Sequence, residues 1–344
     1  MTQYKLYIHH RPFLGDFGIT NQLLTLFISL ESIQGTSVVF VDGLYAQYNN
    51  PHSKIPFSNL VNIHHINTHI LNNKIYLIDI LHIPADISFT WGDAGTHEKI
   101  PNMYLKDLLC GKNIFDIYPN VSDPLPNQKK KFYINIPSVE TCIQLQEENG
   151  KMHSNCQEVT AKYIFTEQNM STPFVLDLLK NIQFAISPNL ELPLQKRYSV
   201  VHLRNEKDAI EWWSRQNKLP RRIFEQELNS KYLRLIHKHI PEDEYVIILT
   251  SNTSLNPVVH ELQKTYKHII VNEGNSTQRE VMAIYDLLLA CKYCNSVLIC
   301  PSGGSTFASL LCLKLQEQFT KHVFFDLNNI RTDETVIMNR DTLD

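Results

Sequence analysis

The stretch YSVVHLRNEKDAIEWW, residues Tyr198–Trp213, decides how the second half of this chain is interpreted. Its opening YSVVH predicts a buried strand, and Arg204 follows within two positions. A guanidinium at the end of such a strand can bind a diphosphate in a cleft through paired hydrogen bonds and stabilise the negative charge that develops during a reaction. It can equally form a salt bridge with Glu206 or Asp208, and the residues alone leave both interpretations open.

The segments that follow alternate Val- and Ile-rich strands with helices. We expect strands in RYSVVHLR, EYVIILTSN, KHIIVNEG, NSVLICPSGG and KHVFFDL. We expect helices in RRIFEQELNSKYLRLIHKHI, NPVVHELQKTY, QREVMAIYDLLLACKYC and STFASLLCLKLQ. Such an alternation predicts a Rossmann-like doubly wound sheet.

The first half begins with a similar pattern. KLYIHH predicts a strand, NQLLTLFISLESIQG predicts a helix that ends at Gly35, and SVVFVDG predicts a buried parallel strand. This β-α-β order indicates a second α/β unit. Residues 45–130 are rich in Asn, His and Pro with few clean periods, and they predict loops, short helices and a variable surface.

Three further segments bear on the domain organisation. PNQKKKFYINIP predicts a solvated loop of lysines followed by a strand. STPFVLDLLKNIQFAIS predicts a helix capped by Ser171 or Thr172. SPNLELPLQKR has the Pro-rich composition of an interdomain linker. We therefore expect two domains, residues 1–190 and residues 191–344.

Composition narrows the class of protein. Of the 344 residues 43% are hydrophobic, enough for a core in each half, and the net charge of −3 disfavours a general nucleic-acid binder. The N-terminal MTQYKLYIHHRP lacks the pattern of a secretory signal, and no apolar run approaches the ~20 residues of a membrane span. We expect a cytoplasmic protein without a membrane span.

The cysteines and carboxylates argue against a metal. Cys291 and Cys294 form a C-x-x-C without a second such pair, so we interpret them as core residues rather than a zinc or redox site. The chain has no D-x-D tripeptide of the kind that holds a nucleotide diphosphate through a metal. We expect activity that needs neither a metal nor a cofactor.

Three polar clusters follow predicted strands in the second half: HLRNEKD, TSNTS and PSGGSTF. Because ligands bind outside the carboxyl ends of the strands in such a sheet, these clusters converge on one site. PSGGSTF also offers backbone N–H groups and hydroxyls at a helix start, which suits an anion. It is neither a P-loop nor a nucleophile elbow. His202 can contact a nucleotide or be a hydrogen-bonded core histidine.

The clusters resemble the fucosyltransferase superfamily of GT-B glycosyltransferases, which includes protein O-fucosyltransferase-like and plant O-fucosyltransferase-like enzymes. HLRNEKD is similar to the family's H-x-R signature, and EVMAIYDLLLACKYCNSVLICPSGGSTFASLL resembles its later motif. LGDFGITNQLL resembles the family's G-x-F-x-N-Q loop, although Ile19 and Thr20 are two extra residues between Gly18 and Asn21. The resemblance implies two Rossmann-like domains that face each other across a cleft.

The resemblance also implies roles for single residues. Arg204 would bind the β-phosphate of a nucleotide sugar and stabilise the leaving group, while His202 and Asn252 would lie near the nucleoside. The other residues expected at the donor are Ser302, Gly303, Gly304, Ser305 and Thr306. The cleft would be lined from the N-terminal domain by Gly15, Phe17, Gly18 and Asn21. Asp16 is our preferred catalytic base, and the alternatives are Glu206, Asp208 and Glu211.

The function expected by resemblance is inverting, metal-independent transfer of fucose from GDP-fucose to a hydroxyl of a glycan or protein. Two alternatives stay open: another donor, such as a rhamnose or xylose nucleotide, and a non-catalytic module that only binds the nucleotide sugar. We expect one of Trp212 and Trp213 in the core and the other half-exposed, or a sugar-stacking pair. TWGDAGTHEK, around Trp91, is assigned to an acceptor loop on position alone.

Overall fold

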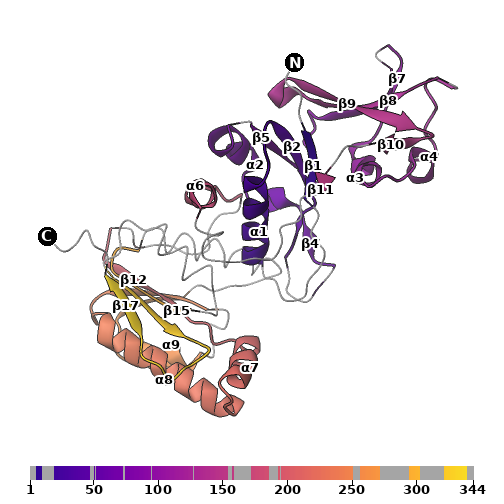
Figure 1. The fold of residues 1–344 in the computed structure, drawn as a ribbon. Coiled ribbons are helices and arrows are strands. Elements are labelled where there is room, and N and C mark those ends of the chain that lie inside the picture. Colours follow the sequence, from indigo (N-terminus) through magenta and orange to yellow (C-terminus); the bar gives the residue numbers. More distant parts are fainter. Residues whose placement is uncertain are drawn as a thin grey trace. The chain divides into compact units, whose positions relative to one another are not determined.

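The structure is a computed structural model of mixed α/β type (Figure 1). It describes residues 5–9, 19–46, 50, 52–72, 74–93, 95–126, 128–153, 157–158, 172–185, 193, 195–250, 256–271, 294–302 and 321–338. Contacts between Cα atoms divide the chain into two units, whose main segments are Gln22–Ile164 and Ile186–Asp344. The boundary predicted between residues 190 and 191 falls outside the described residues, and the cleft between two facing domains stays a prediction.

The first unit contains a parallel sheet built on the predicted β-α-β order. Its strands are β1 (Lys5–His9), β2 (Ser37–Val41), β5 (Ile75–Asp79) and β11 (Gln157–Glu158), in the spatial order β11-β1-β2-β5. Helix α1 (Ile19–Glu31) connects β1 to β2 and buries most of its apolar side chains, including Leu23 and Phe27. The strand, helix and strand predicted from KLYIHH, NQLLTLFISLESIQG and SVVFVDG are confirmed.

A five-stranded antiparallel sheet lies in the same unit, and it includes β8 (Lys131–Ile136), the strand predicted after the lysines of PNQKKKFYINIP. The strands are β6 (Ser88–Gly92), β7 (His97–Lys99), β8 (Lys131–Ile136), β9 (Thr141–Glu148) and β10 (Lys151–His153), in the order β10-β9-β8-β6-β7. The short helices predicted over residues 45–130 are confirmed, but the prediction missed β6 and β7, and β6 alternates buried and half-buried residues with the period of a strand. In the core of this sheet, the Phe132 ring stacks on two others. Its centroid lies 5.5 Å from that of Phe89 and 6.0 Å from that of Trp91.

Lys130 also contradicts the predicted solvated lysine loop. Its side chain is buried, its Nζ lies 3.0 Å from the Asp123 carboxylate, and the ammonium lies 5.1 Å from the centre of the Trp91 ring. The ion pair and the aromatic face compensate for the hydration that the Lys130 ammonium loses on burial. Both partners are brought in by the fold, so the run of lysines in the sequence does not reveal them.

Short elements complete the first half of the chain. Two short strands, β3 (Leu44–Tyr45) and β4 (Lys54–Ile55), form a hairpin. The short helices are η1 (Phe57–Asn59), α2 (Ile63–His65), η2 (Ile66–Ile70), η3 (Asn102–Tyr104), α3 (Leu105–Leu109), α4 (Ile114–Ile117) and η4 (Pro137–Val139). Helix α6 (Pro173–Asn181) confirms the helix predicted after residue 171. The Thr172 hydroxyl accepts a hydrogen bond from the Val175 amide at 3.3 Å, as a cap does.

The second unit is organised around a six-stranded sheet. Its strands are β12 (Tyr198–His202), β13 (Tyr245–Leu249), β14 (His268–Val271), β15 (Val297–Ser302), β16 (Lys321–Asp326) and β17 (Thr335–Met338). The spatial order is β14-β13-β12-β15-β16-β17, which is 3-2-1-4-5-6 in chain order, and β17 alone is antiparallel. The five predicted strands are confirmed, whereas β17 was not predicted.

Three described helices accompany this sheet: α7 (Lys207–Gln216), α8 (Arg221–His239) and α9 (Pro257–Leu262). Phe224 and Leu228 of α8 and Val258 of α9 share one buried cluster with Val201 of β12 and Ile248 of β13. The two helices therefore pack against one face of the sheet, and α8 runs along it in Figure 1. The helices predicted in QREVMAIYDLLLACKYC and STFASLLCLKLQ lie outside the described residues.

A buried carboxylate holds the amino ends of the central strands together. Glu244 accepts hydrogen bonds from the hydroxyls of Ser199 at 2.7 Å and Ser296 at 2.8 Å, and its carboxylate lies 2.7 Å from Nε of Arg197. Ser199 belongs to β12, and Ser296 directly precedes β15. The register between β12 and β15 is thus fixed at the edge opposite to their carboxyl ends.

Candidate functional site

The candidate site lies where β12 and β15 end. These parallel neighbours pair Val201 with Ile299, but the chain leaves β12 toward β13 on one side and β15 toward β16 on the other. In an open parallel sheet, such a reversal opens a crevice at the carboxyl ends, and ligands bind there. HLRNEKD begins at the last residue of β12 and PSGGSTF begins within β15, so both clusters start at this edge of the sheet.

Arg204 lies two residues beyond β12 with its side chain 31% exposed. Its Nη1 lies 2.8 Å from Oε2 of Glu206, so the salt bridge that the sequence left open is present. Glu206 precedes the first residue of α7, and it caps that helix without a hydrogen bond from its side chain. The ion pair orients a solvent-accessible guanidinium at the edge of the sheet. Binding of a diphosphate by Arg204 stays a prediction.

Tyr232 of α8 fixes the backbone on either side of this position. Its hydroxyl donates to the His202 carbonyl at 3.0 Å and accepts from the Arg204 amide at 2.9 Å. Burial raises the pKa of the Tyr232 hydroxyl far above its usual range, so the proton is retained. Leu203, between them, is fully buried and donates its amide to the Leu249 carbonyl at 2.9 Å. The segment that carries Arg204 is therefore held on both sides.

A network of asparagines adjoins Arg204, and the sequence did not reveal it. Asn205 donates to Oδ1 of Asn229 at 3.1 Å, and Asn256 donates to Oδ1 of Asn205 at 2.9 Å. Asn256 is buried and caps α9 by accepting from the Val258 amide at 3.0 Å. The network joins the ends of β12 and β13 through α8 and α9. The Asn256-Pro257 start of a helix was a readable cap signal, but its partners lie far apart in sequence.

His202 ends β12 as a half-buried residue whose Nδ1 is shielded from solvent. Its Nδ1 has no hydrogen-bond partner among the residues that the structure describes, and burial lowers the pKa of the imidazole to about 4. The histidine is therefore neutral near pH 7 and offers one nitrogen acceptor or donor. Both interpretations of His202, nucleotide contact and core residue, stay open.

The other predicted site residues divide into three groups. Glu211 is exposed on α7 and forms an ion pair with Arg215 at 2.5 Å. Asn21, Asp208 and Ser302 have a described backbone in α1, α7 and β15, but their side chains lie outside the described part. The remaining predicted residues lie wholly outside it: Gly15, Asp16, Phe17, Gly18, Asn252, Gly303, Gly304, Ser305 and Thr306.

The structure tests the prediction for the two tryptophans and describes Cys294 of the predicted C-x-x-C, whereas Cys291 lies outside the described residues. Trp213 packs against the core of the second unit while Trp212 is 57% exposed, which confirms one core and one exposed ring. Trp91 is fully buried in the β6–β7 hairpin, so its ring belongs to the core, and the assignment of TWGDAGTHEK to an acceptor loop stays a prediction. Cys294 is buried with its Sγ near backbone carbonyls, and no group of three potential metal ligands occurs among the described residues.

The G-x-F-x-N-Q resemblance includes Gln22, which has a structural role. Its amide donates to the Tyr45 carbonyl at 3.0 Å and accepts from the Tyr45 amide at 2.8 Å. The side chain thus pairs with the backbone of β3 as a neighbouring strand would. Gln22 holds the segment after β2 against the first turns of α1.

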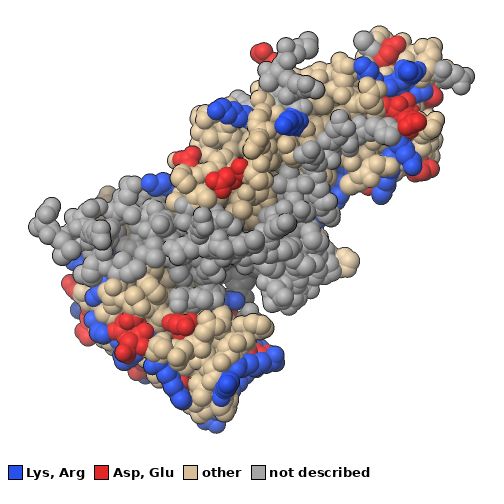
Figure 2. All heavy atoms as spheres, viewed as in Figure 1, with Lys and Arg blue, Asp and Glu red and all other residues tan. Residues whose placement is uncertain are grey.

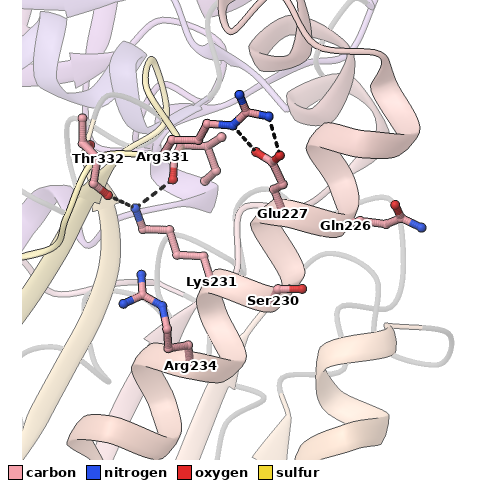
Figure 3. A pocket seen from close by; sticks show the side chains of 8 residues that line it. Gln226, Glu227, Ser230, Lys231, Arg234, Arg331 and Thr332 are labelled. Carbon is pink, nitrogen blue, oxygen red and sulfur yellow. Dashed lines mark hydrogen bonds and ion pairs between the residues drawn. The ribbon is translucent and has the colours of Figure 1, made fainter.

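A hollow of about 420 Å³ lies between α8 and the segment that follows β16 (Figure 3). Lys231 donates from its floor to the carbonyls of Ile330 at 2.9 Å and Thr332 at 2.5 Å, and Arg331 forms an ion pair with Glu227 at 2.7 Å. These contacts bind the segment after β16 to α8. None of the predicted donor residues lines this hollow, so it is not the predicted donor site.

Comparison with known proteins gave little similarity. No family model matches the chain, and no curated protein matches it. Among solved structures, the NodZ alpha-1,6-fucosyltransferase co-crystallised with GDP is similar over 98% of this chain and 99% of its own, at 13% identity and a TM-score of 0.45. A likeness at this level establishes neither fold nor function. Within the described residues, no helix is long and apolar enough to cross a membrane.

Proposed function

We propose that this chain is a glycosyltransferase that moves fucose from GDP-fucose to an acceptor hydroxyl, with inversion and without a metal. The observation that carries the proposal is the position of Arg204, a solvent-accessible guanidinium beyond β12 at the point where the strand order reverses. That position is where open parallel sheets bind nucleotides. The resemblance of HLRNEKD to the H-x-R signature supports the choice of donor.

The proposed reaction is a single displacement. The acceptor oxygen bonds to the anomeric carbon, the bond from that carbon to the β-phosphate oxygen breaks, and the electron pair leaves with GDP. Negative charge grows on the β-phosphate, where Arg204 stabilises it, and the start of the helix predicted in STFASLLCLKLQ would add backbone N–H donors. His202, which is neutral near pH 7, would contact the nucleoside of the donor.

A carboxylate takes the acceptor proton, and Asp16 is the base that we propose. Two of the alternatives are already engaged: Glu206 pairs with Arg204 and Glu211 pairs with Arg215. One oxygen of each carboxylate is held by a charge-assisted hydrogen bond to a guanidinium, and that contact would have to open before the oxygen could take the acceptor proton. Asp208 is the remaining alternative.

The proposal is tested first by binding. GDP or GDP-fucose at 100 times its Kd stabilises the native state by about 2.7 kcal/mol, which raises Tm by roughly 5–10 °C. UDP, UDP-sugars and GDP-rhamnose form the comparison panel. If another nucleotide sugar raises Tm more than GDP-fucose does, that sugar replaces fucose as the proposed donor. If no nucleotide raises Tm, the proposed donor site is refuted.

The variants Arg204→Ala and Arg215→Ala form a matched pair for turnover. Each removes an arginine that pairs with a nearby glutamate, but only Arg204 lies at the carboxyl end of β12, two residues beyond the strand. We expect Arg204→Ala to lower kcat by about 10²–10³ and Arg215→Ala to leave it unchanged. Binding of GDP-fucose without any transfer or hydrolysis by the unaltered protein would indicate a non-catalytic module.

A further inference from the structure

Basic residues gather at the corner where α7 meets α8. The stretch from residue 207 to 223, called here the basic corner, contains five Lys or Arg residues and two acidic residues, a local charge of +3 in a chain whose net charge is −3. The five cations are all exposed: Lys207, Arg215, Lys218, Arg221 and Arg222. Figure 2 shows Lys and Arg side chains gathered along this end of the second unit. The corner therefore attracts anions against the charge of the whole protein.

Two large apolar side chains project from the same corner. Trp212 is 57% exposed and Ile223 is 39% exposed, and they are two of six exposed large hydrophobic residues in the described part of the chain. Trp213 packs against the core beside Trp212, with ring centroids 6.4 Å apart at 87°. Because Trp213 already serves the core, folding does not account for the exposed indole of Trp212.

The turn between the helices retains a lysine at an unfavourable backbone position. Lys218 has φ of +54°, in the left-handed region where glycine or asparagine is preferred. The exposed Lys218 side chain places a positive charge in the turn between α7 and α8, at the cost of backbone strain that a glycine would avoid.

We propose that the basic corner docks on the surface of an anionic lipid membrane. Lysine and arginine meet acidic headgroups, while an indole and an aliphatic side chain insert at the boundary of the hydrocarbon. A nucleic acid would use the cations but offers no aliphatic layer for Ile223. The proposal does not depend on the donor or the reaction proposed above.

Vesicle sedimentation with the full chain tests this docking. We expect binding to vesicles that contain phosphatidylglycerol, no binding to vesicles of phosphatidylcholine alone, and weaker binding as salt rises. The variant with Arg221→Glu and Arg222→Glu should bind at least about thirtyfold more weakly. The control carries Lys74→Glu and Lys99→Glu, the same charge change at exposed lysines of the first unit, and should retain binding.

The apolar contribution is tested separately. Trp212→Ala should weaken binding to the anionic vesicles and abolish the blue shift of tryptophan emission, whereas Met103→Ala, which removes an exposed side chain in the first unit, should change neither. Absence of binding, or equal loss in the two charge variants, would overturn the proposal. Binding to heparin or RNA without binding to vesicles would also overturn it, in favour of a polyanion partner. Thermal melts confirm that each variant is folded.

Discussion

Replacement of Tyr232 by phenylalanine tests whether the backbone beside Arg204 must be held. The change removes one hydroxyl that bonds both the His202 carbonyl and the Arg204 amide and leaves the ring in the core. Each bond contributes about 1 kcal/mol, and a buried group that loses its partner adds a desolvation penalty, so the loss of stability is about 2–4 kcal/mol. Urea unfolding followed by circular dichroism measures it.

The functional consequence is an effect on nucleotide affinity beyond the loss of stability. An arginine whose amide is released no longer presents its guanidinium in one position, so part of a charge-assisted hydrogen bond to phosphate is lost. We expect GDP to bind about tenfold more weakly to Tyr232→Phe, a difference of about 1.4 kcal/mol. Titration calorimetry well below the melting temperature measures this affinity.

The matched control is Tyr266→Phe. Tyr266 is also buried, and its hydroxyl donates to the carbonyls of Ile236 at 3.3 Å and Ile240 at 3.0 Å, away from the strand ends. This variant should lose about 1–2 kcal/mol of stability and bind GDP normally. Equal affinities for GDP in the two variants would refute the argument that Tyr232 positions Arg204.

Three further predictions concern stability and metal dependence. Glu244→Ala should destabilise the protein by about 2–4 kcal/mol in urea because it removes the partner of two buried hydroxyls, whereas Glu261→Ala, at an exposed ion pair, should change stability by less than about 0.5 kcal/mol. Burial holds the pKa of His202 and of His322 at about 4, below 6.5 in the unfolded chain, so the unfolded state binds more protons and stability falls as pH drops from 6.5 to 4. The slope is at most about 1.4 kcal/mol per pH unit for each histidine, and an unchanged slope in a His202→Gln variant would contradict this assignment. EDTA should leave transferase activity unchanged, and strict dependence on an added divalent cation would contradict the metal-free mechanism.

The sequence predicted the second unit better than the first for a physical reason. β12, β13, β15 and β16 are buried on both faces, so each appears as a run of Val, Ile and Phe that is visible locally. The antiparallel sheet has one half-exposed face, and β6 shows only five residues of alternation between polar segments. Such short alternation is easily mistaken for a loop.

The residues of the candidate site divide in a similar way. Arg204 could be predicted because it follows a strand that the sequence defines clearly. Asn229 and Tyr232 could not, because their roles depend on α8 lying beside the end of β12, and they look like ordinary helix residues. Lys130 illustrates the same limit, since its burial depends on Trp91, a residue 39 positions earlier in the chain.

The order of the parallel sheet in the first unit has a consequence for biosynthesis. β1 pairs with β2 early in the chain, but its other neighbour, β11, is reached only when Gln157 comes to lie opposite Tyr7, 150 positions later (157 − 7). At 5–20 residues per second, the ribosome needs roughly 8–30 s to make that stretch. During this time one edge of β1 is open to pairing with other nascent chains, a hazard that a chaperone would have to cover.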